Sequence, residues 1–343
     1  MTRKMATIRK IDAVRAIPGA DAIECCIVGG WTVVTRKGEY TPGDRAVYCE
    51  IDSFIPTAIA PFLTKPGHYA KTFEGIEGER LRTVSLRKQL SQGLLLNLDQ
   101  VIPETNSFVE GDDVSQRLGI VKYEAPIPAA LQGEIKGMFP SVIPKTDQER
   151  IQNLSAELAE WQAEDLHWEV TEKLEGSSMT VYCIDGQVGV CSRNLDLKRN
   201  PENSLWRAAI RHKLEEKLEG YGNIAIQGEL VGNGIQGNIY RMRDQDFYVY
   251  DVYDIDAGRY FTPTERKTLT EALDLLHCPV LAYSAAFYDT LGITDMSQLL
   301  KFAEGHSVLG DITGPQREGL VFKCHEKSVS FKVVSNAYLL GEK

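Results

Sequence analysis

The sequence has few of the features that mark secreted, membrane-bound or zinc-clustered proteins. Its seven cysteines include no Cys-x-x-Cys pair and no Cys/His group with zinc-ligand spacing, so we expect buried thiols in a reducing compartment, the cytoplasm. There is no long apolar run, and the N-terminal residues lead into strand-like alternation rather than the apolar core of a signal peptide. We therefore expect an unsecreted protein that does not bind membranes, and nothing in the sequence indicates an obligate protein partner.

An excess of positive charge is also lacking. The chain has 38 basic and 48 acidic residues, a net charge of -10, which disfavours indiscriminate binding to nucleic acids or anionic membranes. A polyanion would have to bind at a local basic patch. The segment Arg80–Lys88 is such a patch, because it has no acid and four cations, Arg80, Arg82, Arg87 and Lys88. These cations either bind the phosphates of a nucleic acid or are the outward-facing charges of an ordinary strand.

The 343 residues are enough for two domains, each with its own core. Over about the first 100 residues, short strand-like runs alternate with Gly, Pro and Asp. The runs Ile23–Val28 and Trp31–Arg36 flank Gly29 and Gly30, a pattern that predicts a β-hairpin. Several short strands with little helix favour a small barrel of the OB type.

The second half of the chain has a different pattern. Residues 126–145 contain several prolines, which predict a linker or a strap across a surface. Two segments, Thr146–Glu149 and Thr262–Glu265, have the pattern of a helix capping box, and the first predicts a helix from Arg150 to Leu166. Asp185 and Gly186 predict a hairpin turn between two strands. We therefore expect an α+β fold, with an antiparallel-sheet domain after the barrel.

Lys173 begins a Lys-x-acidic-Gly element with Glu175 and Gly176, placed where a strand should enter a tight turn. A lysine amine can attack phosphorus once burial or nearby cations lower its pKa. With this composition, the four-residue pattern would occur by chance in roughly one chain in five. Its significance therefore depends on the segments that follow it.

Four later segments contain residues that suit phosphate chemistry. They are Ser192–Asn194, Gly228–Gly232, Phe247–Asp251, and the pair Glu318–Lys323 with Ser330–Lys332. With Lys173, their order and spacing closely resemble the motifs of the covalent nucleotidyltransferases, the superfamily of ATP-dependent RNA and DNA ligases and mRNA capping enzymes. The resemblance covers nearly all of residues 145–343.

The position of the barrel indicates which family within this superfamily the chain resembles most. Capping enzymes and most DNA ligases continue into a C-terminal OB domain, whereas this chain stops eleven residues after Lys332 and has its barrel in front. This layout is similar to the ATP-dependent RNA ligases with an N-terminal OB domain. The resemblance implies an OB-fold nucleic-acid-binding domain at 1–125, a linker at 126–145 and a nucleotidyltransferase (adenylyltransferase) domain at 146–343.

The resemblance also implies a reaction. Lys173 would attack the α-phosphorus of ATP, expel pyrophosphate and form a lysyl-AMP. The AMP would pass to a 5′-phosphate end of RNA, which is then joined to a 3′-hydroxyl, in RNA repair at nicks whose 3′-hydroxyl strand is RNA. Nucleotidyl transfer requires charge neutralisation, and Glu175, Glu229 and Glu318 could hold hydrated Mg²⁺ or Mn²⁺.

Other residues are expected to hold the nucleotide. Tyr250 resembles the ring that stacks on adenine, although it could equally be a core aromatic. Arg193 could bind a phosphate or ribose, or form a surface ion pair. The full set of residues expected to bind ATP is Lys145, Arg150, Gln152, Glu172, Lys173, Arg193, Glu229, Tyr250, Lys323 and Lys332.

The last hairpin decides whether two lysines act together. If it turns through four residues with Cys324 opposite Val329, Lys323 and Lys332 share one face and converge on the same phosphates. A three- or five-residue turn would separate them. Related enzymes often carry a second lysine two residues after the first, where this chain has Val334, so we expect Lys323 to take that role. We count both lysines, with Lys173 and the three glutamates, as catalytic.

Two alternatives stay open at this point. One is a DNA ligase or a GTP-using enzyme related to capping enzymes, against which the expected absence of a C-terminal domain argues. The other is a non-catalytic RNA-binding protein with a decayed transferase domain, which the intact set Lys173, Glu229, Glu318 and Lys332 disfavours.

Overall fold

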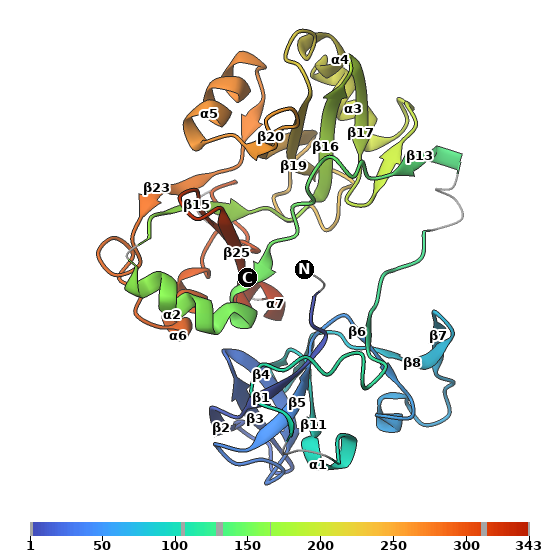
Figure 1. Cartoon of the computed structure of the whole chain (residues 1–343), viewed down its shortest axis with the longest axis vertical. Coiled ribbons are helices and arrows are strands. Elements are labelled where there is room, and N and C mark those ends of the chain that lie inside the picture. The colour runs from blue at the N-terminus through green and yellow to red at the C-terminus, as the bar shows by residue number, and fades with distance from the viewer. Residues whose placement is uncertain (1–2, 104–106, 128–132, 165, 310–313, 342–343) are drawn as a thin grey trace. The chain divides into compact units, whose positions relative to one another are not determined.

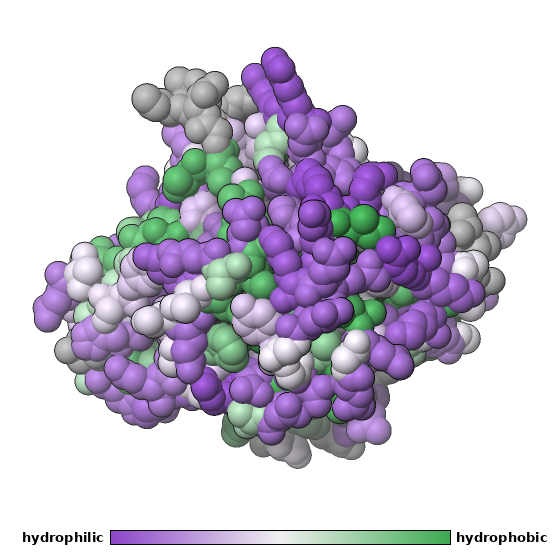
Figure 2. All heavy atoms as spheres, turned by 90° about the horizontal axis from the view of Figure 1, so that it is seen from above, coloured by the Kyte–Doolittle hydropathy of each residue, from purple (hydrophilic) through white to green (hydrophobic). Residues whose placement is uncertain are grey.

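The computed structural model describes residues 3–103, 107–127, 133–164, 166–309 and 314–341. It divides the chain into two compact units, Met1–Pro126 and Ile127–Lys343 (Figure 1). Hydrophilic side chains cover most of the face seen in Figure 2, with apolar ones scattered between them. Within the described ranges, no helix has the length and apolar character needed to span a membrane.

The first unit consists of short, mostly antiparallel strands in four sheets. The sheet orders are β1-β5-β11, β2-β3-β4, β12-β6-β8-β7 and β10-β9. The elements are β1 (Ala6–Lys10), β2 (Ala13–Ala16), β3 (Ile23–Val28), β4 (Trp31–Arg36), β5 (Arg45–Cys49), β6 (Ser53–Pro56), η1 (Pro61–Leu63), β7 (Lys71–Phe73), β8 (Ile76–Arg80), β9 (Val84–Leu86), β10 (Gln89–Ser91), β11 (Leu94–Asn97), α1 (Leu98–Val101) and β12 (Val121–Lys122).

Turn chemistry and a buried aromatic pair explain how this unit forms. Gly29 and Gly30 have φ values of 55° and 88°, a conformation that glycine adopts without the steric cost of a Cβ. The hairpin they connect is confirmed, with Val28 opposite Trp31. Trp31 then stacks on Tyr48 with ring centroids 5.8 Å apart, and both rings are buried in the core.

The second unit contains two sheets. The larger has the order β13-β18-β17-β16-β19-β20-β21, with β22 parallel to β20, and the smaller has the order β14-β25-β24-β15-β23. The strands are β13 (Ile135–Met138), β14 (Glu149–Arg150), β15 (Trp168–Lys173), β16 (Ser177–Ile184), β17 (Gln187–Cys191), β18 (Leu195–Leu197), β19 (Ile224–Gly232), β20 (Gln245–Asp254), β21 (Arg259–Tyr260), β22 (Leu276–His277), β23 (Val280–Ala285), β24 (Gly319–Cys324) and β25 (Val329–Val334).

Helices cover one face of each sheet in this unit, as Figure 1 shows. Apolar side chains of α3, α4 and α5 share a core with the larger sheet, and those of α2 and α6 share a core with the smaller sheet. The helical elements are η4 (Ile151–Leu154), α2 (Ser155–Ala163), α3 (Ser204–Arg211), α4 (Leu214–Lys217), α5 (Pro263–Ala272), α6 (Met296–Phe302) and α7 (Asn336–Leu340).

Two local predictions in this unit are confirmed. Asp185 and Gly186 have positive φ values of 50° and 73° and connect β16 to β17, as a two-residue hairpin requires. Thr262 caps α5 through a full capping box with Glu265, with Pro263 in the first turn. In both places a short sequence pattern fixes the backbone by itself.

Two other predictions need correction. Residues 149–150 form β14, which pairs in parallel with β25, so the helix predicted from Arg150 begins at Ile151 as the 3-10 helix η4 and continues as α2 from Ser155. Neither helix has a side-chain cap. Pairing with a distant strand outweighs the local capping pattern. Within the predicted linker 126–145, residues 135–138 form β13 at the edge of the larger sheet. This part of the segment belongs to the second unit's sheet.

Candidate active site

Lys173 is the last residue of β15 and lies opposite Gly319 of β24. Glycines bring the surrounding backbone close together. A Cβ on Gly319 would lie 2.1 Å from the Val333 carbonyl oxygen, and one on Gly176 would lie 2.4 Å from the Leu230 carbonyl oxygen. Both distances are far inside van der Waals contact. Gly176 therefore allows the turn after Lys173 to pack directly against β19.

The amine of Lys173 is held by a carboxylate. Its Nζ lies 2.6 Å from Glu318 Oε1, and the two side chains are 26% and 19% exposed. Glu318 precedes β24, and its own carbonyl accepts a hydrogen bond from the Ser335 amide. The predicted nucleophile is therefore oriented by an ion pair at the meeting point of β15, β24 and the end of β25.

Two further motif carboxylates belong to this region: Glu229 interacts electrostatically with Lys173 and Glu318, and Glu175 follows Lys173 by two residues. Burial raises the pKa of Glu229 to about 8; the positive charge of Lys173 opposes the shift and the negative charge of Glu318 adds to it. Glu175 Oε1 accepts a 3.4 Å hydrogen bond from the Gly237 amide. Its Oε2 is buried and has no hydrogen-bond partner among the residues that the structure describes.

This arrangement fits a hydrated divalent cation. The described residues contain no group of three or more His, Cys, Asp or Glu side chains close enough together to bind a metal directly. A divalent cation held here would favour the ionised form of Glu229, whose pKa is raised by burial, and would add to the positive charge of Lys173 beside Glu318. Mg²⁺ usually keeps several of its water ligands, so these carboxylates can hold it through water.

The last hairpin has the four-residue turn, one of the three turn lengths that the sequence left open. Cys324 lies opposite Val329, Lys323 opposite Ser330 and Lys332 opposite Val321. Lys332 also lies beside Arg150 in the parallel pairing of β14 and β25. Because side chains alternate along a strand, the Lys323 and Lys332 side chains emerge on one face of the sheet, and Arg150 shares that face with Lys332.

Lys323 nevertheless has a buried partner. Its Nζ lies 2.7 Å from Asp251 Oδ1 and donates to the Tyr250 carbonyl at 2.7 Å. Both side chains of the ion pair are 8% exposed. Lys323 therefore links β24 to β20, and its function as a second phosphate-binding lysine stays a prediction.

Arg266, which the sequence analysis did not single out, extends this network of buried charge. Its side chain is completely buried, and its guanidinium binds Glu169, lies 3.7 Å from Asp251 and donates to His277 Nε2 at 2.8 Å. Burial opposes ionisation of Glu169, but the His325 hydrogen bond and the Arg266 charge outweigh it and lower its pKa to about 2. An arginine in an amphipathic helix gives no sequence signal of such a role.

Tyr250 is a residue of β20 in the larger sheet and is contacted by Lys323 from the smaller sheet. Its hydroxyl is 2.9 Å from Thr146 Oγ1, and Lys323 Nζ lies 5.6 Å from its ring centroid. Burial raises the pKa of its hydroxyl. The ring packs against a small apolar cluster that includes Leu174 and Tyr240. Its position beside the Lys173 turn is compatible with adenine stacking, which stays a prediction.

Other residues predicted to bind ATP are more scattered. Lys145 donates a hydrogen bond to Asn194 Oδ1 at 3.0 Å. Arg193 is exposed and forms a surface ion pair with Asp147 at 2.5 Å, which was the alternative to its binding a phosphate or ribose. Gln152 is 1% exposed.

Glu172 differs from Lys173 in its contacts. It is 2% exposed and accepts hydrogen bonds from Ser307 Oγ at 2.5 Å and the Val308 amide at 2.8 Å. Adjacent residues of a strand point to opposite faces. The carboxylate of Glu172 therefore fixes the 307–308 segment, and its role in ATP binding stays a prediction.

In the basic patch of the first unit, Arg80 has a carboxylate partner and the other three cations are exposed. Arg80 pairs with Asp52 at 2.5 Å and lies 4.7 Å from the Tyr123 ring centroid. Arg82, Arg87 and Lys88 are exposed, and the last two form the turn between β9 and β10. Their binding of nucleic acid stays a prediction.

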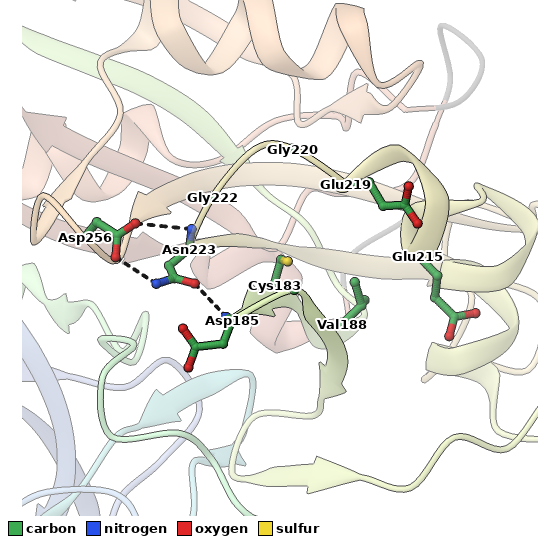
Figure 3. Close-up of a pocket in the computed structure, with 10 residues that line it drawn as sticks. Cys183, Asp185, Val188, Glu215, Glu219, Gly220, Gly222, Asn223 and Asp256 are labelled. Carbon is green, nitrogen blue, oxygen red and sulfur yellow. Dashed lines mark hydrogen bonds between the residues drawn. The ribbon is translucent and has the colours of Figure 1, made fainter.

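A separate hollow of about 420 Å³ lies at the other end of β16 (Figure 3). Four acids, Asp185, Glu215, Glu219 and Asp256, contribute to its lining. Asn223 donates to Asp256 Oδ1 at 2.8 Å and accepts from the Asp185 amide at 2.7 Å. The eight residues of β16 span about 23 Å, so this acidic hollow is distinct from the Lys173 site.

Two protein-family models match this chain. The RNA ligase family model matches residues 166–334, and an OB-fold domain model matches residues 5–98. These matches confirm the expected α+β fold class with an N-terminal OB-type barrel. No curated protein matches the chain.

Solved structures of an RNA ligase from Naegleria gruberi match the whole chain. A mutant with AMP and Mn is 46% identical, with 98% of each chain covered and a TM-score of 0.82. A mutant with ATP and Mn has the same identity, coverage and TM-score. The protein with PPi matches at 46% identity, with 98% of each chain covered and a TM-score of 0.80.

Proposed function

The chain belongs to the family of ATP-dependent RNA ligases, and from this premise we propose that Lys173 is its nucleophile. The protein is an ATP-dependent RNA ligase with ATP and a divalent metal ion as cofactors. The observation that carries the proposal is the position of the Lys173 amine, 2.6 Å from Glu318 and within electrostatic range of Glu229. The ends joined are an RNA 3′-hydroxyl and a 5′-phosphate.

In the first step, the Lys173 amine attacks the α-phosphorus of ATP. An N–P bond forms, the P–O bond to pyrophosphate breaks, and the amine loses a proton. Glu318 is positioned to accept that proton because its Oε1 is in hydrogen-bond contact with Nζ. Pyrophosphate leaves in line with the attacking nitrogen.

Basic side chains and a divalent ion would neutralise the negative charge of the ATP phosphates. Lys332 and Arg150, neighbours on adjacent strands, supply cations for the phosphates of ATP. Glu175, Glu229 and Glu318 would hold a hydrated divalent ion, which would supply further positive charge for the phosphoryl oxygens. Tyr250 stacks on the adenine.

In the later steps, AMP moves from Lys173 to the RNA 5′-phosphate, and the 3′-hydroxyl then displaces AMP. The first transfer breaks the N–P bond and forms a 5′–5′ pyrophosphate linkage. The second forms the phosphodiester and releases AMP. The first unit, with Arg82, Arg87 and Lys88 exposed, contributes to RNA binding.

The substrate proposal is tested with adenylylated protein and a panel of ends. Nicked duplexes with an RNA or a DNA 3′-hydroxyl strand are compared with single strands, and each has a control with a 5′-hydroxyl in place of the 5′-phosphate. We expect sealing of the nick with the RNA 3′-hydroxyl strand and none of the 5′-hydroxyl controls. Preferred sealing of the DNA 3′-hydroxyl strand would contradict the proposed RNA specificity, and labelling by GTP in place of ATP would contradict adenylyl transfer.

A further inference from the structure

The loop between β19 and β20, residues 233–244, lies against the Lys173 motif. The Glu175 amide donates to the Tyr240 hydroxyl at 2.7 Å, and the Gly237 amide donates to Glu175 Oε1 at 3.4 Å. Glu175 is two residues from Lys173 in the chain. The loop is therefore fixed directly beside the predicted nucleophile.

Internal contacts brace this loop. The Asn238 side chain donates to the Met242 carbonyl at 3.0 Å and accepts from the Met242 amide at 3.1 Å. Tyr240 is 7% exposed and packs in the apolar cluster that includes Leu174. At the base of the loop, Gln245 donates to the Asn233 carbonyl at 2.7 Å. Residues carried by this loop consequently have a defined place relative to the motif.

Two arginines project from the braced loop into solvent. Arg241 and Arg243 are exposed, and among the described residues neither side chain has a hydrogen bond or an ion pair. The loop 233–244 contains these two arginines and one acid, Asp244, and so carries a net positive charge, although the chain as a whole has a net charge of -10. A local unpaired positive charge beside a site that handles phosphates is suited to bind a phosphate anion.

The backbone of Arg241 gives an independent observation. Its φ is 54°, in the left-handed region, which is unfavourable for a residue with a Cβ and more readily adopted by glycine or asparagine. A side chain kept in a disfavoured conformation next to an active site points to a function for that side chain. The same loop also has Gln236 and Asn238 at positive φ.

We propose that Arg241 and Arg243 form a binding site for phosphates of the RNA strand whose end is being joined. This inference rests on the proposed function. Guanidinium groups bind phosphate oxygens through paired hydrogen bonds. The triphosphate of ATP has the same chemistry, but a mononucleotide is usually enclosed in its pocket, whereas both arginines are on the surface, where a polymer can cover them. We therefore assign them to RNA.

The test separates the RNA-independent step from the RNA-dependent steps. The double variant Arg241→Asn with Arg243→Gln removes both charges and relieves the left-handed strain at residue 241. The matched control is Lys267→Gln with Lys301→Gln, which removes two charges from exposed lysines on α5 and α6. Formation of Lys173-AMP is measured against ATP concentration without RNA, and single-turnover sealing by adenylylated protein is measured against RNA concentration at several salt concentrations.

We expect the apparent dissociation constant for RNA to rise on the order of tenfold in the arginine variant. The slope of its logarithm against the logarithm of salt concentration should become shallower by about 1.4, the value for two phosphate contacts on a single strand. The thermal midpoint should equal or exceed that of the wild type, because asparagine tolerates the backbone of residue 241. The lysine control should match the wild type in each measurement.

An unchanged RNA constant and salt slope in the arginine variant would overturn the proposal. So would a changed ATP dependence of adenylylation with normal RNA binding, which would assign the loop to the nucleotide. If the double variant does not fold, Arg243→Gln alone, with no backbone change, is expected to show about half of the salt effect. Failure of the wild type to form Lys173-AMP would instead contradict the proposed function.

Discussion

Replacing Lys323 by methionine tests the buried charge network most severely. The change keeps an unbranched side chain of similar length and removes the cation that lies 2.7 Å from Asp251 Oδ1, where both side chains are 8% exposed. Asp251 would keep only the more distant Arg266, 3.7 Å away, which is already bound to Glu169. A buried carboxylate would be left without a close partner.

The expected cost follows from that burial. Removing one member of a buried ion pair typically costs about 4 kcal/mol, because the other charge is left uncompensated. For a unit the size of Ile127–Lys343, this should lower the thermal midpoint by roughly 8 to 16 °C. Replacing both partners, in Lys323→Met with Asp251→Asn, should recover most of the loss, since no isolated charge remains.

Thermal and urea unfolding of the wild type, the two single variants and the double variant give the coupling energy of the pair. Lys301→Met, an exposed lysine on α6, is the matched control and should change stability little. A Lys323→Met variant within about 1 kcal/mol of the wild type would refute the reasoning. The refolded double variant also tests whether the Lys323 amine binds the phosphates of ATP. If the double variant forms Lys173-AMP as the wild type does, Lys323 has a structural role. If adenylylation stays low although stability is restored, its amine acts on the phosphates.

Three further predictions concern the residues around Lys173. Glu229 ionises in the folded protein only near pH 8, compared with an ordinary value of 4.5, so its contribution to stability falls as the pH rises through that interval. In EDTA, the difference between the thermal midpoints of Glu229→Gln and the wild type should therefore shift in favour of the variant as the pH rises from 5 to 9. A difference that stays constant over this pH range would contradict the prediction. Mn²⁺ should raise the thermal midpoint of the wild type, because it binds the folded state. It should raise the thermal midpoint of Glu175→Gln by less. An equal increase in both proteins would exclude Glu175 from the metal site. Gly176→Ala should destabilise the second unit by about 1 to 3 kcal/mol, because the new Cβ would lie 2.4 Å from a β19 carbonyl oxygen; unchanged urea unfolding would show that the turn can move away.

Local patterns predicted those parts of the fold in which a few neighbouring residues determine the backbone. The turn at Asp185 and Gly186 and the cap at Thr262 belong to this class, whereas the sequence left three turn lengths open for the last hairpin. The start and the cap of the helix predicted from Arg150 were wrong because residues 149–150 pair with β25, about 180 residues away in the chain. A capping pattern contains no information about such a partner.

The candidate site shows the same limit. The motif order placed Lys173, Glu229 and Glu318 together, and the structure brings their charges into one environment. The partners of Lys323 could not be predicted, because Asp251, Arg266 and Glu169 come from three elements far apart in the sequence and meet only when both sheets form. The arginines of loop 233–244 likewise became notable through the contacts of Tyr240 and Gly237 with Glu175.

The position of the covalent AMP is the most direct test of the central claim. The protein is incubated with [α-³²P]ATP and Mg²⁺ or Mn²⁺, digested, and the labelled peptide is sequenced by mass spectrometry, in parallel with Lys173→Ala whose folding is checked by its thermal midpoint. We predict a single phosphoramidate on Lys173 and no label on the folded variant. AMP attached to another residue, or label retained by Lys173→Ala, would contradict the account.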